Sequence, residues 1–384
     1  MRTEKLYETD SRLFTFRAQV LACVQTKDSY RVMLNRTAFF PEGGGQPADT
    51  GSMGEAKVTD VQIMDGEIWH FVDRPLPAGE VDCTLNCEQR LRRMQSHSGE
   101  HIVSGIAHKL YGVENVGFHM GEEAVTVDFD KELTEEQLFN LEELANAAVR
   151  DNLPIRAWYP QPEELSTLVY RSKKEIKEAV RLVEIRGIDL CACCAPHVRS
   201  TGEVGCIRIL DSMRHRGGIR LSLVFGMDAL AAYRVWKKNL SQISADLSVP
   251  KNNTAEALRR LLEEKEQLRL RCAALSDMLA AEKAHSIPQT EGTVCVFSEN
   301  IGETALRNLV NLLMEKCGLA AVFYPEGDGF RYIIGSSRTD LRKLAPEINR
   351  GVNGRGGGKS SMIMGSARAS REEIEAFINH LQLN

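Results

Sequence analysis

Two pairs of potential metal-binding side chains stand out in the sequence. His97 and His101 lie four residues apart within the run 88–110, whose apolar residues recur at helical spacing. Both imidazoles would therefore project from one face of a helix, which is a geometry suited to a metal. Cys193 and His197 repeat the four-residue spacing further along the chain. Three nitrogen donors and one sulfur suit tetrahedral Zn²⁺, so we expect these four residues to bind one zinc ion.

The cysteines around the second pair decide between a metal site and a coincidence. A single histidine pair at helical spacing is more often a coincidence than a site. The sequence, however, places Cys191, Cys193 and Cys194 just before His197. In a chain that we expect to be cytoplasmic, such a cluster favours metal binding or catalysis over disulfides. Cys193 is the preferred ligand because it alone repeats the spacing of the histidine pair, and Cys191 and Cys194 are the alternatives.

These residues and three further stretches resemble a known family. A helical His-x-x-x-His followed by a distant Cys-x-x-x-His is similar to the zinc signature of the editing domains of alanyl-tRNA and threonyl-tRNA synthetases, and of the freestanding alanyl-tRNA editing proteins called AlaX. The stretches 40–51 (Phe-Pro-Glu-Gly-Gly-Gly-Gln, then Asp-Thr-Gly) and 198–205 favour the alanyl branch. The stretch 353–359 resembles the glycine-rich part of the domain that ends alanyl-tRNA synthetases and also occurs in DHH phosphoesterases. One departure is local: Cys194, Ala195 and Pro196 fill the gap where the family usually has small residues and Thr.

The resemblance implies a trans-editing hydrolase that deacylates mischarged alanine tRNA, Ser-tRNA or Gly-tRNA, by cleaving the aminoacyl ester. Zinc would polarise the ester or position the substrate. The general base stays open between Glu100, Glu42 and an ordered water. The expected catalytic residues are His97, His101, Gln46 and Thr37, and the expected substrate-binding residues are Gly43, Gly44, Gly45 and His119.

The elements that must position these residues predict an α+β fold in four parts. Residues 1–86 read as short strands separated by turn signals, which indicates a small β-barrel containing the glycine-rich loop. Residues 87–226 read as a zinc-binding α+β editing domain with the histidine helix at its start. Residues 227–288 form a helical linker, and residues 289–384 alternate strands with helices as a compact α/β module.

The C-terminal third is expected to bind tRNA or to assemble chains. Leucines in the linker repeat every seven residues, a coiled-coil pattern that would pack within one chain or join two. The run 331–371 contains many more basic than acidic residues, and Arg355 and Lys359 lie in its glycine-rich part. We expect Arg355 and Lys359 to contact tRNA phosphates, although a charged run is usually only a solvated face. A homodimer through this region is the alternative role.

The length and composition of the chain are typical of a globular protein and not of a membrane protein. The chain has 384 residues, 43% of them hydrophobic, and a net charge of −5. No stretch approaches the length of about 18 apolar residues that would cross a bilayer, so we expect a cytoplasmic protein without membrane contact. Nothing resembles the adenylate-forming core of a synthetase, which predicts a freestanding protein whose partner is alanine tRNA.

Three other functions are compatible with parts of the sequence. A non-catalytic tRNA-binding protein stabilised by zinc is the main alternative, because four protein ligands are typical of structural zinc. A DHH-type phosphoesterase is disfavoured, since the chain contains no Asp-His-His triplet. Hydrolysis by a Cys194 nucleophile is chemically allowed beside a histidine, but no spacing supports it.

Overall fold

The computed structural model describes residues 3–172 and 179–382, which fall into two compact units, Met1–Asn239 and Leu240–Asn384. In these described ranges no helix is both long and apolar enough to cross a membrane. The α+β class expected from the sequence is confirmed, because both units mix helices with largely antiparallel sheets.

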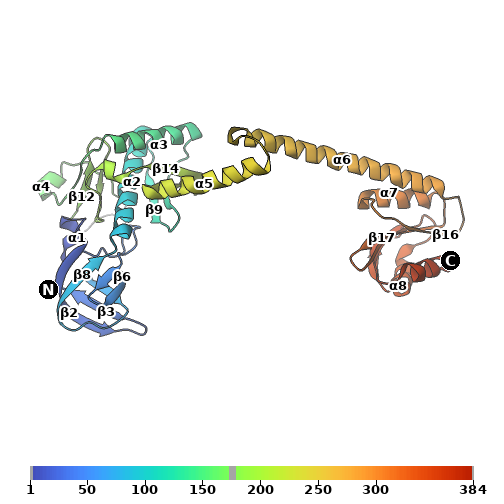
Figure 1. Cartoon of the computed structure of the whole chain (residues 1–384), viewed down its shortest axis with the longest axis horizontal. Coiled ribbons are helices and arrows are strands. Elements are labelled where there is room, and N and C mark those ends of the chain that lie inside the picture. Colours follow the sequence, from blue (N-terminus) through green and yellow to red (C-terminus); the bar gives the residue numbers. More distant parts are fainter. Residues whose placement is uncertain (1–2, 173–178, 383–384) are drawn as a thin grey trace. The chain divides into compact units, whose positions relative to one another are not determined.

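The first unit begins with a closed β-barrel, shown in blue in Figure 1. Inward and outward residues alternate along β6 and β7, and the inward ones are apolar except for His70, which is why the sheet can close around a core. Val32, Leu34 and Val58 are completely buried in that core. A short helix α1 (Leu6–Thr9) and the strand pair β1 (Glu4–Lys5) and β4 (Arg36–Thr37) lie outside the barrel order. The barrel order is β2 (Thr15–Gln25), β3 (Tyr30–Leu34), β7 (Glu67–Val72), β6 (Ala56–Met64), β5 (Gly51–Met53) and β8 (Gly79–Leu85).

The rest of the first unit is an α+β layer around helix α2 (Cys87–Tyr111). The side chain of Asn86 caps the start of α2 by accepting from the backbone N–H of Gln89, and Gly112 ends the helix in the left-handed conformation at φ 61°. Helix α3 (Glu135–Arg150), which begins with the expected Thr134–Gln137 capping box, packs beside α2. The remaining helical elements are α4 (Pro162–Leu165), the short η1 (Thr201–Val204) and α5 (Met227–Asp246).

Two small sheets complete this layer. One has the order β14 (Ile207–His215), β15 (Gly218–Phe225), β10 (Val125–Phe129) and β9 (Asn115–Met120), all antiparallel. The other has the order β11 (Ile155–Trp158), β12 (Leu182–Ile185) and β13 (Asp189–Ala192). Gly105 of α2 allows β13 to come close, because a Cβ there would lie 2.7 Å from the carbonyl oxygen of Ile188. The start of β13 is therefore held directly against α2.

The second unit is a five-stranded sheet covered on both faces, shown in orange and red in Figure 1. One face packs against α7 (Glu303–Met314) and the C-terminal end of α6 (Thr254–Ser286), which follows the short η2 (Lys251–Asn253). The other face packs against α8 (Leu341–Gly351) and α9 (Arg371–Asn379), and the expected Ser370–Glu373 capping box begins α9. The strand order is β16 (Thr293–Phe297), β17 (Leu319–Glu326), β18 (Gly329–Gly335), β20 (Met362–Ala367) and β19 (Arg355–Gly358).

The leucines of the seven-residue pattern in α6 are exposed on the helix surface. Leu261, Leu268 and Leu275 are 50–64% accessible, and Leu258 and Leu279 are exposed as well. Only Ala280 and Ala284 near the end of α6 are buried. The packing partner of this apolar seam and the four-part division of the chain therefore stay predictions.

Candidate metal centre

Helix α2 supplies two of the four expected ligands from its most buried stretch. His97 and His101 lie one helical turn apart, and every residue from Ser96 to Ala107 is buried. A helix buried all round is not amphipathic, so its polar side chains need partners inside the protein. The two imidazole centroids are 5.4 Å apart with the rings tilted by 31°.

The other two ligands lie in the turn that follows β13. Arg181, which is buried, holds this turn by donating from Nη1 to the carbonyl oxygens of Cys193 and Ala195, each at 3.0 Å. The backbone N–H of Cys193 donates in return to the carbonyl of Arg181 at 3.0 Å. The turn is thus fixed through its backbone, and its side chains are free to face α2.

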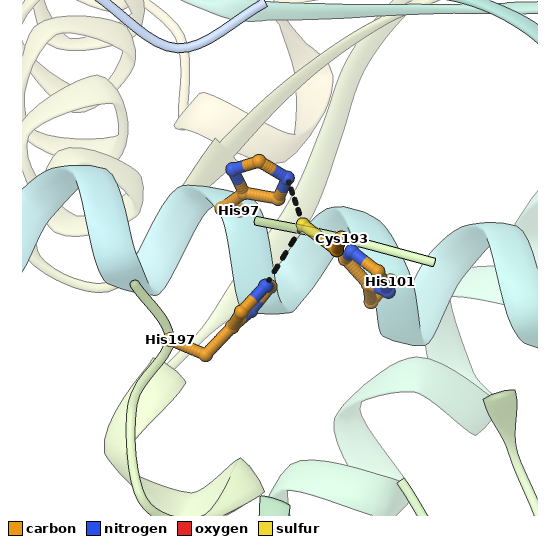
Figure 2. Close-up of side chains that lie close together, drawn as sticks. All are labelled: His97, His101, Cys193 and His197. Atoms are coloured by element: carbon orange, nitrogen blue, oxygen red, sulfur yellow. Dashed lines mark hydrogen bonds between the residues drawn. The ribbon is translucent and has the colours of Figure 1, made fainter. Parts of the chain in front are cut away.

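The structure brings the four side chains together around one point (Figure 2). Sγ of Cys193 lies 3.5 Å from Nε2 of His97 and 3.3 Å from Nε2 of His197. Tetrahedral zinc with Zn–S of about 2.3 Å and Zn–N of about 2.0–2.1 Å places S and N about 3.5 Å apart. One donor atom from each of the four residues lies within 4.8 Å of all the others. The spacing of the side chains therefore fits a zinc ion.

Each of the three histidines is held at its other ring nitrogen. Nδ1 of His97 is 2.9 Å from Oε1 of Gln46, Nδ1 of His101 is 2.8 Å from Oδ2 of Asp189, and Nδ1 of His197 is 3.0 Å from Oγ of Ser98. An Nδ1–H that donates to such a partner leaves the lone pair on Nε2, which is the usual arrangement around protein-bound metals. All three rings therefore direct a nitrogen to the cluster. Burial lowers the pKa of His101, but its hydrogen bonds to Asp189 and Cys193 outweigh burial and raise that pKa well above its usual value, so a metal would displace a proton from this ring.

The charges of the cluster also suit a cation. Burial raises the pKa of the Cys193 thiol, but the charge of His97 and the hydrogen bonds from His101 and His197 together outweigh burial and hold that pKa well below its usual value. The sulfur is thus favoured as a thiolate, the form that binds metals. Burial lowers the pKa of His197 to about 3, which keeps this imidazole neutral. Burial raises the pKa of Asp189, but the bonds from His101 and Arg171 lower it to about 2, so Asp189 stays a carboxylate.

The glycine-rich loop reaches the cluster through Gln46. Gly43 and Gln46 exchange two backbone hydrogen bonds of 3.0 Å around Gly44 and Gly45, whose φ angles are +61° and +83°. This is a type I′ turn, which requires positive φ at both central positions. A Cβ on Gly45 would lie 2.4 Å from the carbonyl oxygen of Phe118. The turn is therefore packed directly on β9 and places Gln46 beside His97.

Thr37, an expected catalytic residue, and His119, an expected substrate-binding residue, are not members of the cluster. Thr37 is completely buried in the barrel, where its Oγ1 is 2.8 Å from Nε2 of His70 and accepts from the backbone N–H of Phe39. His119 is exposed on β9. Its neighbour Phe118 lies on the opposite side of the strand, with its ring centroid 5.0 Å from that of His97. The structure thus brings Phe118, and not His119, to the cluster.

The alternative residues are also placed. Cys191 is buried near His101 and Asp189, on the side of His101 that Asp189 occupies, whereas Cys194 is exposed. Oε1 of Glu100 accepts from Oγ of Ser104 at 2.6 Å and from Nδ2 of Asn115. Oε2 of Glu42 accepts from Gln62 at 2.7 Å on the barrel surface. Cys193 is the cysteine that the geometry places among the three histidines.

Sequence reasoning missed the side chains that support the cluster. Asp189 and Ser98 were not singled out, although Ser98 lies within the histidine motif and Asp189 lies four residues before Cys193. Arg171 donates two hydrogen bonds to the Asp189 carboxylate, from Nε to Oδ1 at 2.7 Å and from Nη2 to Oδ2 at 2.9 Å. A short polar residue next to an expected ligand was the available signal for Ser98. The contact of Arg171 depends on tertiary packing and has no signal in the spacing.

The expected tRNA-binding residues lie in the second unit on the edge strand β19 and just after it. Strand β19 pairs only with β20, and all of its residues are exposed. Among the described residues, Arg355 and Lys359 form no ion pair, whereas Arg338 pairs with Glu291 and Arg342 with Asp340. The unpaired charges of Arg355 and Lys359 are therefore available to an external anion.

Comparison with known proteins defines the class of this cluster. Residues 180–221, which include Cys193 and His197, match the family described as the second additional domain of threonyl and alanyl tRNA synthetases. This part of the chain is thus similar to the type of domain that the Cys-x-x-x-His motif resembles.

Similarity to whole proteins extends well beyond that domain. The chain is 26% identical to alanyl-tRNA editing protein AlaX-L of Pyrococcus horikoshii over 99% of its own length and 100% of that protein. It is 28% identical to alanyl-tRNA editing protein Aarsd1-A of Xenopus laevis, covering 92% of this chain and 89% of that protein. The chain is thus similar over most of its length to two proteins named alanyl-tRNA editing proteins, the family that its sequence motifs resemble.

The synthetases themselves are longer than this chain. The chain is 28% identical to an alanine-tRNA ligase of Methanopyrus kandleri, a match that covers 95% of this chain but 43% of the ligase. The chain therefore spans less than half the length of the ligases that it matches.

Proposed function

We propose that this protein is a hydrolase that deacylates mischarged alanine tRNA by cleaving the aminoacyl ester of Ser-tRNA or Gly-tRNA. The observation that carries the proposal is the convergence of His97, His101, Cys193 and His197, with each histidine held at Nδ1 by a separate partner. The similarity to proteins named alanyl-tRNA editing proteins over nearly their whole lengths supports the same substrate class.

The four clustered residues would hold one Zn²⁺. Bound zinc would supply a Lewis acid that polarises the ester carbonyl or anchors the amino and hydroxyl groups of the substrate. The residues of the chain provide orientation: Gln46, Asp189 and Ser98 fix the three rings, and Arg171 in turn fixes Asp189. The type I′ turn of Gly43, Gly44 and Gly45 would form the wall of the substrate site next to Gln46.

We expect the protein to distinguish Ser-tRNA from Ala-tRNA by a hydrogen bond to the hydroxyl group of the serine. A site built to hydrogen-bond a substrate hydroxyl can reject the analogue without it by about 10⁴ to 10⁵. Thr37 is the proposed contact. His70 donates through Nδ1 to the carbonyl of Val32, so its Nε2 accepts the proton of the Thr37 hydroxyl. After accepting from Phe39, the Thr37 oxygen keeps one lone pair for a substrate hydroxyl.

The candidates for the general base, which accepts a proton during ester hydrolysis, are Glu100, Glu42 and an ordered water. The three histidines of the cluster are committed to metal and to their Nδ1 partners, so they are poor bases. Glu100 is the buried candidate, one residue from His101, and its carboxylate is oriented by Ser104 and Asn115. If Glu100 or Glu42 is the base, changing that residue to Gln should lower kcat by about 10²- to 10⁴-fold, and if neither change does so, the acceptor is an ordered water.

The second unit is proposed to bind the tRNA body through phosphates, with Arg355 and Lys359 as contacts. Its exposed leucine seam in α6 would serve a homodimer or a packed helix. Neither role supplies groups to the metal cluster, whose residues all belong to the first unit.

Deacylation of charged tRNA tests the proposal directly. Purified protein is mixed with alanine tRNA charged with Ser, Gly or Ala, and release of the amino acid is followed with and without a zinc chelator. The proposal expects release from Ser-tRNA or Gly-tRNA, little release from the Ala ester, and loss of activity on chelation that added Zn²⁺ restores. A metal-loaded, folded protein that releases none of the three amino acids would contradict it.

A second candidate function is favoured by the ligand count. Four protein ligands are typical of structural zinc, which would make this a non-catalytic tRNA-binding protein. This function expects tRNA binding without hydrolysis, and a fold that melts when the metal is removed. Circular dichroism of the chelated protein at the assay temperature separates it from the enzyme, which would lose hydrolysis while it stays folded.

A further inference from the structure

Arg90 is a fully buried arginine on α2 that the chemistry described above does not use. Its exposed fraction is 0%, and it lies seven residues, or two helical turns, before His97 on the same side of the helix. Arginine is almost never fully buried unless it is paired, so each of its donors needs a partner. Those partners come from three separate segments of the chain.

The first partner of Arg90 is Asp49, which closes the loop that carries Gln46. Nε of Arg90 donates to Oδ2 of Asp49 at 2.9 Å, and Nη2 donates to the same oxygen. Oδ2 of Asp49 also accepts from the backbone N–H of Phe40 at 2.7 Å, and the N–H of Asp49 donates to the carbonyl of Phe40 at 2.9 Å. The two ends of the loop, Phe40 and Asp49, are therefore clamped together below the turn that presents Gln46.

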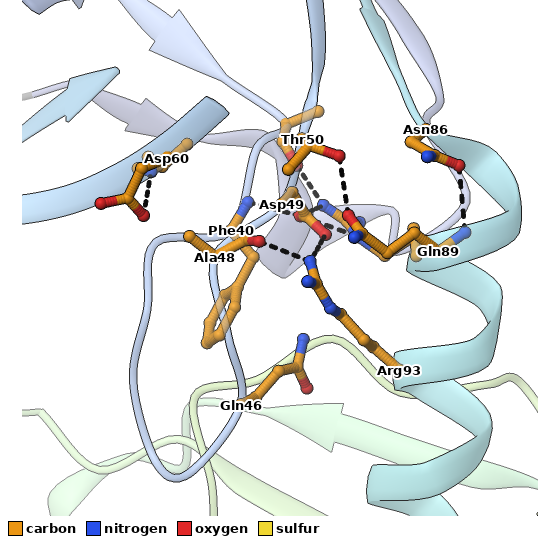
Figure 3. A network of polar contacts seen from close by, with 12 residues as sticks. Phe40, Gln46, Ala48, Asp49, Thr50, Asp60, Asn86, Gln89 and Arg93 are labelled. Atoms are coloured by element: carbon orange, nitrogen blue, oxygen red, sulfur yellow. Dashed lines mark hydrogen bonds and ion pairs between the residues drawn. The ribbon is translucent and has the colours of Figure 1, made fainter. Parts of the chain in front are cut away.

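A second arginine of α2 reinforces this clamp. Nη1 of Arg93 donates to the carbonyl of Ala48 and lies 3.7 Å from Oδ1 of Asp49. Figure 3 shows Asp49 at the centre of this network, with Phe40 and Arg93 around it and Gln46 nearby. Asp49 Oδ1 is buried and has no hydrogen-bond partner among the residues that the structure describes, so this carboxylate depends on the two arginines.

The other partners of Arg90 lead to the turn that carries His197. Nη1 of Arg90 donates to the carbonyl of Ser11 at 3.0 Å, and Oγ of Ser11 donates to the carbonyl of His197 at 2.8 Å. Nη2 also donates to the carbonyl of Ala38, at the start of the loop. One guanidinium thus connects α2 with the loop of Gln46 and, through Ser11, with the backbone of His197.

We propose that Arg90, together with Asp49, is a positioning residue. It fixes the loop of Gln46 and the turn of His197 relative to the two metal ligands on α2. The proposal rests on the proposed function for its consequence in catalysis, but its effect on metal geometry stands alone. A planar guanidinium offers five donors in a fixed fork, so it holds three segments at fixed angles where a lysine ammonium would not. The alternative is that the buried pair only stabilises the barrel.

Cobalt binding to the full-length protein tests the proposal without tRNA. Co²⁺ replaces the native metal, its visible spectrum reports the geometry around the Cys193 thiolate, and competition with a chelator gives its affinity. The variants are Arg90→Lys, which keeps the charge but not the fork, and Asp49→Asn, which keeps the shape. The matched control is Asp82→Asn, which breaks the exposed Arg17–Asp82 pair of the same barrel, with a bond of 2.9 Å.

The expected result is an altered cobalt spectrum and an affinity lowered by about 10- to 100-fold in Arg90→Lys and Asp49→Asn, the range found when groups that orient metal ligands are lost. Asp82→Asn should match the wild type. Folded Arg90→Lys and Asp49→Asn proteins with the wild-type spectrum and affinity would overturn the proposal and leave the pair a purely stabilising role.

A milder variant covers the case in which both substitutions prevent folding. Ser11→Ala removes only the bond to the His197 carbonyl and leaves the Ser11 carbonyl for Arg90. It should shift the cobalt spectrum with little change in melting temperature, and an unchanged spectrum would overturn the proposal. If the wild type binds Co²⁺ but hydrolyses no ester, the proposed function fails while this test still holds. If the wild type is active, Arg90→Lys should lower kcat more than it raises KM.

Discussion

Oε1 of Gln46 lies 2.9 Å from Nδ1 of His97, so the glycine turn of the barrel is hydrogen-bonded to the helix that carries the metal ligands. The barrel and the α+β layer, which were expected as separate domains, therefore meet at the cluster itself. Met120 strengthens this junction, because its backbone N–H donates to the carbonyl of Gly45 at 3.1 Å. The position of the barrel turn and the properties of the metal site are thus coupled.

Replacing Gln46 by Ala should weaken metal binding because His97 loses the acceptor that fixes its ring and its tautomer. The expected loss of affinity is about 10- to 100-fold, as for other groups that orient metal-bound histidines. Competition with a chelator of known affinity measures it. Gln62→Ala is the control, since Gln62 bonds only to Glu42 and Asp60 on the barrel. Equal affinities of the two variants would contradict an orienting role for Gln46.

The three neighbouring cysteines should respond differently to replacement. Cys193→Ala removes the sulfur that lies 3.5 and 3.3 Å from two histidines, so the protein should be purified without stoichiometric zinc. Cys191→Ala and Cys194→Ala should keep one zinc per chain. Elemental analysis of the three proteins measures this, and full zinc in Cys193→Ala would move the ligand to one of its neighbours.

The two central glycines of the turn form a matched pair. Both have positive φ, so Ala at either position costs about 1–2 kcal/mol of backbone strain. A Cβ on Gly44 meets nothing within 4 Å, whereas a Cβ on Gly45 would lie 2.4 Å from the Phe118 carbonyl. Gly45→Ala should therefore lower the melting temperature and the metal affinity more than Gly44→Ala. Equal losses in thermal unfolding and chelator competition would show that the turn is not packed on β9.

Local patterns predicted the elements well, because they depend on short-range chemistry. The run 88–110, whose apolar residues recur at helical spacing, forms helix α2, and residues 1–86 contain the short strands of a barrel, as the sequence indicated. The bounds of the strand Gly79–Leu85 are harder to predict, because it carries Glu, Asp and Thr on its exposed face and is marked mainly by the strands that it pairs with in the barrel.

The ligand set was predictable, and its supports were not. His97, His101, Cys193 and His197 repeat one spacing, which a sequence displays directly. Asp189, Arg171 and Arg90 act through side chains that reach across the fold, and nothing in the spacing of these residues distinguishes them from surface charges. Thr37 was singled out by resemblance, but its burial against His70 follows from barrel closure.

Thr37→Val should affect both stability and selectivity. Valine cannot donate to Nε2 of His70, and a buried acceptor left unpaired costs about 1–3 kcal/mol of unfolding free energy. Loss of the hydroxyl contact should also bring the rates for Ser and Ala esters closer together. Urea unfolding and parallel deacylation of Ser-tRNA and Ala-tRNA measure the two effects. A destabilised variant with the wild-type ratio of rates would limit Thr37 to a structural role.

Removing single charges from the second unit should change tRNA affinity without changing the bond-breaking step. Arg355 and Lys359 are not neutralised by acidic partners among the described residues, so each can release a counterion on binding a phosphate. Arg355→Ala or Lys359→Ala should lower the slope of log K against log salt by about one unit. The rate at saturating tRNA should stay at the wild-type value, because the metal cluster belongs to the other unit.

Arg338→Ala is the control, since its ion pair with Glu291 already neutralises that charge, and its slope should change less. Filter binding from low to high salt measures the slopes. If Arg355→Ala, Lys359→Ala and the wild type show one slope and one affinity, this basic segment is a solvated face and the second unit serves assembly.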